Sequence, residues 1–143
     1  FNATILQLPL AEHLKKDEQE LLNMIFPTHD IDGLTVKNKI KLLDKDDEAL
    51  IPCTALAVQK IIEHELNQKD LSGQKICIVN RSDLIGKPLF NLLLNNNATV
   101  TVAHSKTDKD INNYQTMAAD SCTLCQSGQK VDAIINSFGY SKI

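Results

Sequence analysis

The sequence predicts an α/β protein whose second half forms part of a doubly wound parallel sheet. Two short segments rich in β-branched residues, Lys75–Val79 and Thr99–Ala103, flank an apolar helical stretch that begins near Pro88. A third apolar segment, Val131–Ser137, follows a polar crossover. Strands and helices that alternate in this way are typical of parallel strands joined by right-handed crossovers.

The first third of the chain predicts a different unit. Ile5–Leu10 carries mostly leucine and isoleucine in alternation, which predicts a strand. Glu18–Ile25 predicts a helix that Pro27 ends. A polar loop over 28–34 leads to a helix of low hydrophobicity, and the acidic run 44–48 is expected to be a solvated loop.

The clearest helix is predicted to begin at 52–54, with Thr54 as its cap. Its packed face is defined by apolar residues at helical spacing, which are Val58, Ile61, Ile62 and Leu66. We expect this helix to link the two units.

Composition and charge narrow the classes of function. The chain has 143 residues, of which 43% are hydrophobic and 23% charged, as is typical of a soluble globular protein. A net charge of -3 does not suit a nucleic-acid partner, which requires a basic face. No apolar run approaches the ~20 residues needed to cross a membrane, so a membrane partner is not expected either.

The four cysteines suit a reducing compartment. Cys77 lies in an apolar run and is expected to be a buried thiol, whereas Cys53 lies in a loop. Cys122 and Cys125 have the CxxC spacing of zinc or redox sites. A structural zinc site needs four ligands, and neither a second pair nor a nearby histidine completes this one. We therefore interpret the CxxC as chance or a surface insertion and expect no metal.

The loop 80–88 joins a buried strand to a helix, which is where doubly wound folds bind phosphate groups. The glycine-rich GxGxxG pattern is absent, so the loop does not match the general dinucleotide motif. It offers instead Arg81, whose planar guanidinium suits a phosphate, together with Ser82 and Gly86. The alternative is a surface arginine beside a helix-capping serine, and the loop by itself favours that alternative.

The end of the second strand favours NADP over NAD. In NAD-binding folds an acidic residue about 20 positions after the loop holds the ribose 2′-hydroxyl. Here the strand ends in HSKT at 104–107, and the first carboxylate is Asp108. Hydroxyls and cations accept a 2′-phosphate, so Arg81 and Ser105 together predict NADP. A capping hydroxyl and a solvated lysine are the alternative interpretation of this segment.

Six segments occur in an order and spacing similar to those of one enzyme family. They are ILQLPL at 5–10, DIDG at 30–33, PCT at 52–54, RSDLIGKP at 81–88, ATVT at 98–101 and HSKT at 104–107. On these segments the sequence resembles the bifunctional methylenetetrahydrofolate dehydrogenase/methenyltetrahydrofolate cyclohydrolase family. The resemblance covers nearly the whole chain and is weakest over 108–130.

The resemblance implies an organisation and an activity. Residues 1–51 would be the end of an N-terminal α/β folate-site domain, 52–70 a linking helix, and 71–143 the N-terminal half of an NADP-binding Rossmann-type domain. The family uses NADP to oxidise 5,10-methylenetetrahydrofolate to 5,10-methenyltetrahydrofolate, and it hydrolyses the product to 10-formyltetrahydrofolate in one-carbon metabolism. A homodimer is expected, in the cytoplasm, with organellar targeting left open.

The resemblance also assigns roles on the folate side. Gln7 matches a glutamine that hydrogen-bonds the catalytic lysine, although the residues alone favour a core glutamine bonded to backbone. Asp32 matches the aspartate that binds the pterin, whose N–H groups suit a carboxylate. Asp30 is expected to be a structural turn residue. The family's lysine and tyrosine would precede Phe1, so the chain alone is expected to be inactive.

The family's cofactor contacts correspond to Asn80, Arg81, Ser82, Ser105 and Gly139, with Ser105 near the 2′-phosphate and Gly139 in the loop after the third strand. The family usually has glycine in place of Asn80, Pro-x-Gly in place of ALA at 55–57, and proline in place of Ser141. A non-catalytic relative that binds folate or nucleotide, or serves in dimerisation, is therefore the alternative. An unrelated NADP-dependent dehydrogenase is a third hypothesis, but it would not require Gln7 or the DIDG segment.

Overall fold

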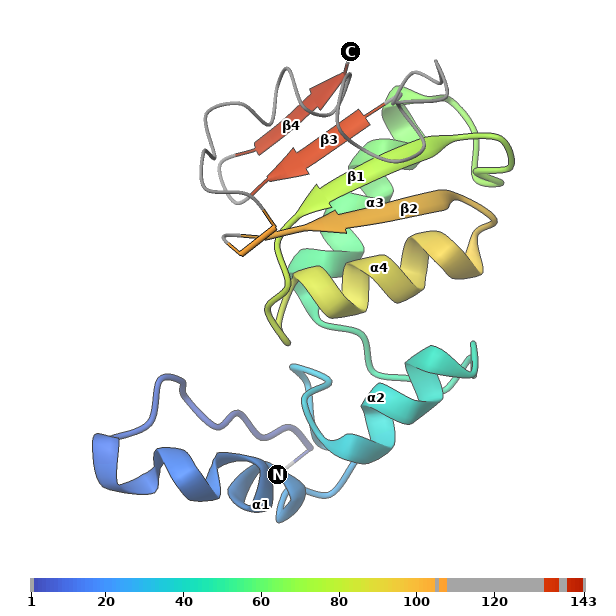
Figure 1. Ribbon diagram of the computed structural model, residues 1–143. Helices are drawn as coiled ribbons and strands as arrows, with labels where there is room; N and C mark the ends of the chain where they lie inside the picture. The colour runs from blue at the N-terminus through green and yellow to red at the C-terminus, as the bar shows by residue number, and fades with distance from the viewer. Residues whose placement is uncertain (1, 105, 108–132, 137–138, 143) are drawn as a thin grey trace.

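The computed structural model describes residues 2–104, 106–107, 133–136 and 139–142. Its elements in chain order are the 3-10 helix η1 (Glu12–Asp17), α1 (Glu18–Asn23), α2 (Val36–Leu43), α3 (Cys53–Glu65), β1 (Lys75–Val79), α4 (Gly86–Asn95), β2 (Thr99–Ala103), β3 (Ala133–Asn136) and β4 (Gly139–Lys142). Figure 1 shows α1 and α2 at one end of the molecule, and the sheet with α3 and α4 at the other.

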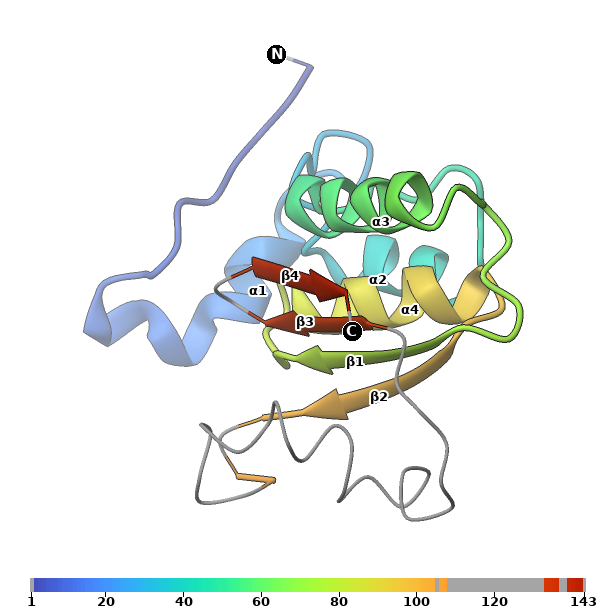
Figure 2. The same ribbon diagram turned by 90° about the horizontal axis from the view of Figure 1, so that it is seen from above.

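The strands form one four-stranded sheet in the order β2-β1-β3-β4. The strand β1 runs parallel to both of its neighbours, so that Cys77 lies opposite Thr101 on one side and Ile134 on the other. Figure 2 shows α3 and α4 on the same face of this sheet. The predicted α/β class is therefore confirmed, and the parallel order β2-β1-β3 with α4 as the crossover from β1 to β2 agrees with the predicted partial Rossmann-type sheet.

The edge strand β4 differs from the sequence prediction. Gly139 was expected in a loop, whereas it begins β4 and pairs with Asn136 of β3 in antiparallel register. The two strands are separated in sequence by residues 137–138 alone. Such a connection suits antiparallel neighbours, because parallel strands need a crossover of a dozen or more residues.

The hydrophobic core lies between the sheet and the two helices that cover it. Most of its fully buried side chains come from α3, β1 and α4, among them Ile62, Ile78, Leu89 and Leu93, and Leu71 joins them from the segment between α3 and β1. Burial of one such side chain is worth about 1.5–3 kcal/mol, so the packing of α4 against α3 and the sheet is a main source of stability. Cys77 is buried, as predicted.

The buried face of α3 is partly polar, which the sequence did not predict. Ile61 is 49% exposed, whereas Gln59 and Glu63 are buried. Glu63 accepts hydrogen bonds from Gln59 Nε2 at 2.7 Å and from Asn96 Nδ2 at 3.2 Å, and Lys60 Nζ lies 2.8 Å from its second oxygen. These partners satisfy the carboxylate and allow its burial.

The helices of the first third lie close to where the sequence places them. Thr35 caps α2, because its Oγ1 accepts a hydrogen bond from Asn38 N at 3.4 Å. The α3 helix begins at Cys53, with Pro52 at the cap position and no side-chain cap, so the predicted Thr54 cap is wrong. Within the described residues, no helix is long and apolar enough to span a membrane.

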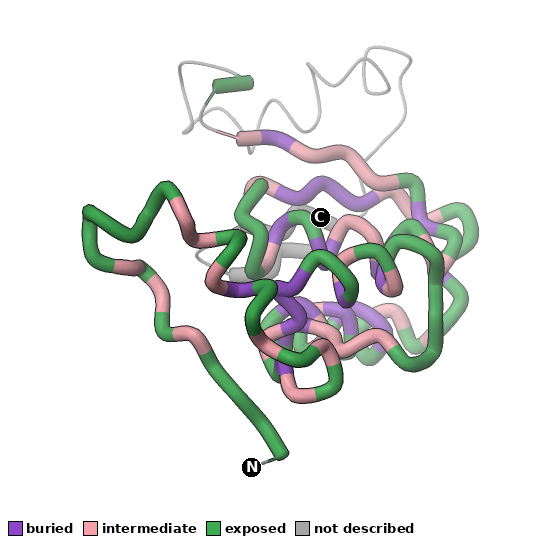
Figure 3. Tube along the Cα trace, turned by 90° about the horizontal axis from the view of Figure 1, so that it is seen from below, coloured by how far each residue is buried: buried purple, intermediate pink, exposed green. Residues whose placement is uncertain are grey.

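The segment Ile5–Leu10 forms no strand, contrary to the prediction. Nearby, Thr4 N donates to His29 O at 2.7 Å, as part of an isolated bridge between Thr4 and Asp30. A strand needs a neighbour for its backbone groups, and no described strand lies beside this segment. Ile5 is therefore 56% exposed, and Figure 3 shows the segment extending away from the rest of the fold.

Two glycines with similar backbone conformations differ in their surroundings. Gly33 and Gly73 have φ of 64° and 81°, so a side chain at either position is strained. A Cβ atom at Gly33 would lie 2.2 Å from Leu50 O, whereas a Cβ atom at Gly73 would meet nothing within 4 Å. Of these two glycines, only Gly33 is therefore required by close packing as well as by its backbone conformation.

We predict that Gly33→Ala lowers the free energy of unfolding by about 2–3 kcal/mol more than Gly73→Ala does, because the backbone near Leu50 must move. Gly73→Ala should cost only about 1–2 kcal/mol, from backbone strain. Urea denaturation of both variants measures the difference. Equal losses would contradict the packing argument.

Candidate functional site

The candidate site lies at the carboxyl ends of β1 and β2. The two strands are parallel and in register, with Val79 opposite Ala103 at their ends. The segment that follows β1 and the segment that begins at His104 therefore leave the sheet at the same edge. In open α/β sheets this edge is where ligands bind.

Three hydrogen bonds shape the loop between β1 and α4. Asn80 Oδ1 accepts from Ser82 N at 2.7 Å, and Ser82 Oγ accepts from Ile85 N at 3.1 Å. The carbonyl of Ser82 accepts from Lys87 N at 3.0 Å. The Ser82 hydroxyl thus stabilises the turn before α4, but it does not cap the helix, because the cap position is Ile85 and has no side-chain cap. The contact of Ser82 with a cofactor is still a prediction.

Gly86 is required where α4 begins. A Cβ atom at this position would lie 2.4 Å from the carbonyl oxygen of Asn80 and 2.7 Å from Arg81 N. The backbone at the end of β1 therefore touches the backbone at the start of α4. Asn80 has no positive φ, so the asparagine does not adopt a left-handed conformation there.

Arg81 is exposed in the same loop. It takes part in no ion pair or side-chain hydrogen bond with any described residue. Its guanidinium, with five N–H donors, is therefore available to an anion. Sequence reasoning found this residue, and the structure brings it to the edge of the sheet where β1 ends.

Asp83 is held by two lysines from different elements. Its Oδ2 lies 3.1 Å from Lys39 Nζ of α2, and its Oδ1 is paired with Lys87 Nζ of α4. Both pairs lower the pKa of Asp83, the pair with Lys87 more than the pair with Lys39, although partial burial acts to raise it. Sequence reasoning missed this cluster, because no local pattern links Lys39 to a residue 44 positions away.

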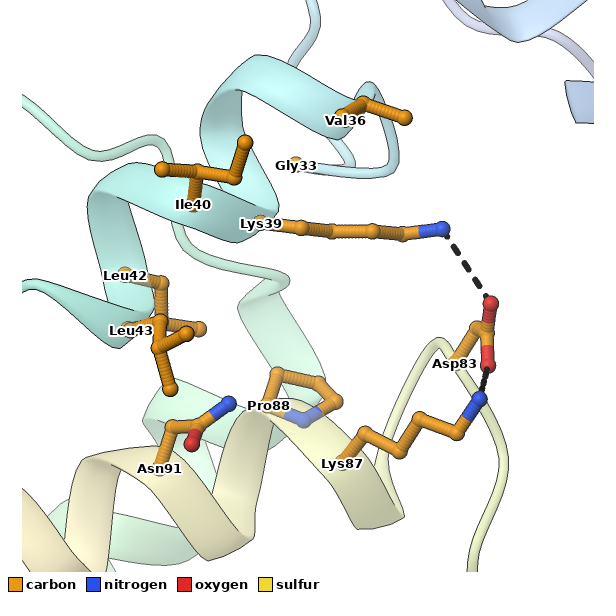
Figure 4. Close-up of a pocket in the computed structure, with 10 residues that line it drawn as sticks. All are labelled: Gly33, Val36, Lys39, Ile40, Leu42, Leu43, Asp83, Lys87, Pro88 and Asn91. Carbon is orange, nitrogen blue, oxygen red and sulfur yellow. Dashed lines mark hydrogen bonds and ion pairs between the residues drawn. The ribbon is translucent and has the colours of Figure 1, made fainter.

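A cavity of about 270 Å³ lies between α2 and α4. Its lining is mostly apolar, with the Lys39–Asp83–Lys87 cluster among the lining residues, and Figure 4 shows the cluster at one side of it. Gly33 also lines the cavity and directly follows Asp32 in sequence. The cavity therefore lies between the loop that carries the predicted folate residue and the loop that carries the predicted cofactor residues.

The two carboxylates of the DIDG loop differ in their surroundings. Asp30 is 1% exposed and accepts hydrogen bonds from Leu34 N at 3.1 Å, Thr35 N at 2.8 Å and Asn38 Nδ2 at 2.9 Å. Asp32 is half-buried and forms no hydrogen bond or ion pair with the described residues. Asp30 is therefore the structural residue, as expected, and the role of Asp32 as a substrate ligand is still a prediction.

The hydrogen bonds to Asp30 also lower the pKa of its carboxyl group. Burial alone would raise the pKa of Asp30, but the bonds from Asn38, Thr35 and Leu34 outweigh burial and lower the pKa. A lowered carboxyl pKa contributes stability that is present above the unfolded-state value of about 3.9. This stability is lost as the pH falls through the folded-state pKa.

The other predicted residues are not all brought to this edge. Gln7 is exposed, and its Nε2 donates to the neighbouring Leu8 O at 2.9 Å, so it is not a core glutamine. Gly139 lies in β4. Ser105 and the CxxC at 122–125 lie outside the described residues. In the part of the chain that is described, no group of three or more histidines, cysteines or carboxylates is placed to hold a metal.

We predict that Asp30→Asn lowers the free energy of unfolding by about 1–3 kcal/mol at pH 7, because an amide cannot accept all three hydrogen bonds. As the pH falls from about 5 to about 3, a range that brackets the ordinary carboxyl pKa, the free energy of unfolding of the variant should also decrease less than that of the wild type. Asp32→Asn is the matched control and should change stability by less than about 0.5 kcal/mol. Urea denaturation at each pH tests this, and equal effects at both positions would contradict the distinction.

Sequence comparisons relate this arrangement to known proteins. The model of the family described as "Tetrahydrofolate dehydrogenase/cyclohydrolase, NAD(P)-binding domain" matches residues 52–130, more than half of the chain. A curated relative, the "Bifunctional protein FolD" of Clostridium tetani, is 39% identical over 138 residues, which cover 96% of this chain and 43% of the relative.

Two solved structures have a similar fold. The bifunctional enzyme FolD, a methylenetetrahydrofolate dehydrogenase/cyclohydrolase from Campylobacter jejuni, matches with a TM-score of 0.73 and 31% identity, over 95% of this chain and 42% of that one. The Trypanosoma brucei enzyme, complexed with NADP cofactor and inhibitor, matches with a TM-score of 0.69 and 28% identity, over 95% and 41%. The chain thus spans about 41–43% of the length of these relatives.

Proposed function

Because this chain belongs to the tetrahydrofolate dehydrogenase/cyclohydrolase family, we propose that it is part of a bifunctional enzyme of one-carbon metabolism. The enzyme oxidises 5,10-methylenetetrahydrofolate to the 5,10-methenyl derivative and hydrolyses that derivative to 10-formyltetrahydrofolate. The bifunctional names of the relatives support both steps. The observation that carries the proposal is the family match over 52–130, which includes α3, β1, α4 and β2.

The proposed cofactor is NADP, which would accept the hydride from the folate. Arg81 would hold a phosphate, since its guanidinium is exposed and unpaired among the described residues at the carboxyl edge of the sheet. Ser82 and Asn80 would contact the cofactor from the same loop, and Ser105 and Gly139 would complete the site. The NADP complex of the trypanosomal relative supports this choice.

Asp32 is proposed to bind the pterin of the folate. Support comes from its lack of partners among the described residues and from the cavity beside Gly33. Gln7 is proposed to orient the family's catalytic lysine. The proposed organisation is an end of the folate domain over 1–51, a linking helix over 52–70, and the first half of the NADP domain over 71–143. The family match, which begins at residue 52, supports the first boundary.

A homodimer in the cytoplasm is proposed as well. The homodimer rests on the resemblance to the family alone. A reducing compartment is supported by Cys53 and Cys77, neither of which forms a disulfide among the described residues.

The second candidate function is a non-catalytic relative that binds folate or nucleotide. It rests on Asn80, where the family usually has glycine. Because the Asn80 side chain accepts a hydrogen bond from Ser82 N at 2.7 Å, it is engaged within the loop. Arg81 is still exposed beside it, which favours the NADP-binding enzyme.

We predict that the chain binds NADP more tightly than NAD and that Arg81→Ala weakens NADP binding about 10- to 100-fold, because a hydrogen bond to a charged group is worth about 1.5–3 kcal/mol. Arg81→Lys should restore only part of the affinity, since an ammonium lacks the planar fork. Calorimetric titration with both cofactors measures these affinities.

Lys69→Ala is the control, because it removes a cation from the exposed loop after α3. It should leave both affinities unchanged. If a folded chain bound NADP and NAD equally, or if Arg81→Ala had no effect, the cofactor proposal would be wrong.

A further inference from the structure

The loop proposed to bind NADP carries a negative charge of its own. Asp83 directly follows Ser82, and its carboxylate is ionised at neutral pH, as an aspartate ordinarily is, with a pKa that Lys87 and Lys39 lower further. A carboxylate repels a phosphate, and NADP has one phosphate more than NAD. An unpaired Asp83 would therefore disfavour NADP in particular.

Two cations offset this charge, and they come from different places in the fold. Lys87 belongs to α4 and pairs with Asp83 at a separation of four residues. Lys39 belongs to α2 and lies 3.1 Å from the other carboxylate oxygen. Figure 4 shows the Lys39 side chain extending from α2 toward Asp83 across one side of the cavity. With both lysines the cluster has a net positive charge.

Lys39 is held in this position by a second contact. Its Nζ donates to Gln19 Oε1 of α1 at 2.9 Å as well as to Asp83. Its side chain is 32% exposed, against 64% for Lys87, so water screens its charge less. Lys39 also lies outside residues 52–130, the part that matches the NAD(P)-binding family model. The charge of the cofactor loop thus depends on a residue from the first third of the chain.

We propose that Lys39 is a positioning and specificity-determining residue that favours NADP over NAD by pairing with Asp83 in the cofactor loop. This inference rests on the proposed NADP site. An ion pair that merely joined α2 to the loop would affect both cofactors equally. An ion pair that offsets the charge of Asp83 should affect the affinity for NADP more than that for NAD. Removing the charge of Asp83 should then compensate for the loss of Lys39.

The test is calorimetric binding of NADP and of NAD to the wild type and to variants of this chain. Lys39→Met should weaken NADP binding about 3- to 10-fold, as expected for a partly exposed charge pair, and NAD binding less than about 2-fold. Adding Asp83→Asn to Lys39→Met should return NADP affinity to within about 2-fold of the wild type. Raising the salt concentration should shrink the effect of Lys39→Met.

Lys41→Met is the matched control, because Lys41 lies on the same helix and pairs with Glu48 at 2.8 Å, within the first third of the chain. Lys41→Met should change neither the affinity for NADP nor that for NAD. Lys39→Arg, which keeps the charge, should retain most of the preference for NADP, and thermal melting confirms that each variant is folded.

Equal weakening of both cofactors by Lys39→Met, or no recovery with Asp83→Asn, would overturn the inference and leave the proposed function intact. The same holds if Lys39→Met has no effect while Arg81→Ala abolishes NADP binding. A folded wild type that binds neither cofactor would overturn the inference and the proposed cofactor site together.

Discussion

The parallel pairing of β1 with β2 is the interaction on which the candidate site depends. Parallel neighbours require a crossover, and α4 supplies it by packing Leu89 and Leu93 into the core. The crossover returns the chain so that both strands end at one edge, where Arg81 and His104 follow them. The same geometry presses the backbone at Asn80 against the start of α4, so packing in the core determines the shape of the loop.

The first third of the chain contributes to the site through two polar networks. Asp30 accepts hydrogen bonds from the backbone of the segment that leads into α2, and Gly33, which directly follows Asp32, lines the cavity. One turn further along α2, Lys39 reaches Asp83 in the cofactor loop. The two loops proposed to hold folate and cofactor are therefore joined by one short helix.

Local sequence patterns correctly predicted several elements of the fold. The strands β1 and β2 lie where β-branched residues predicted them, and the DIDG and RSDLIGKP segments lie beside the cavity and at the sheet edge. Features that depend on distant partners were missed. Ile5–Leu10 lacks a neighbouring strand among the described residues, and Glu63 is buried because Asn96 reaches it from 33 positions away. The Lys39–Asp83 pair likewise joins residues that no periodicity connects.

The contact between Asn80 and Gly86 has a consequence for redesign of the cofactor loop. The contact is made by the Asn80 main chain, so it does not depend on which side chain stands at that position. At Gly86, by contrast, the clash involves the first side-chain atom that any other residue would add. A substitution at position 80 therefore keeps this contact but removes the hydrogen bond from Ser82 N to Asn80 Oδ1, whereas the exposed Arg81 can be varied without losing a hydrogen bond to any described residue. Position 86 should be left as glycine in every redesign of the loop.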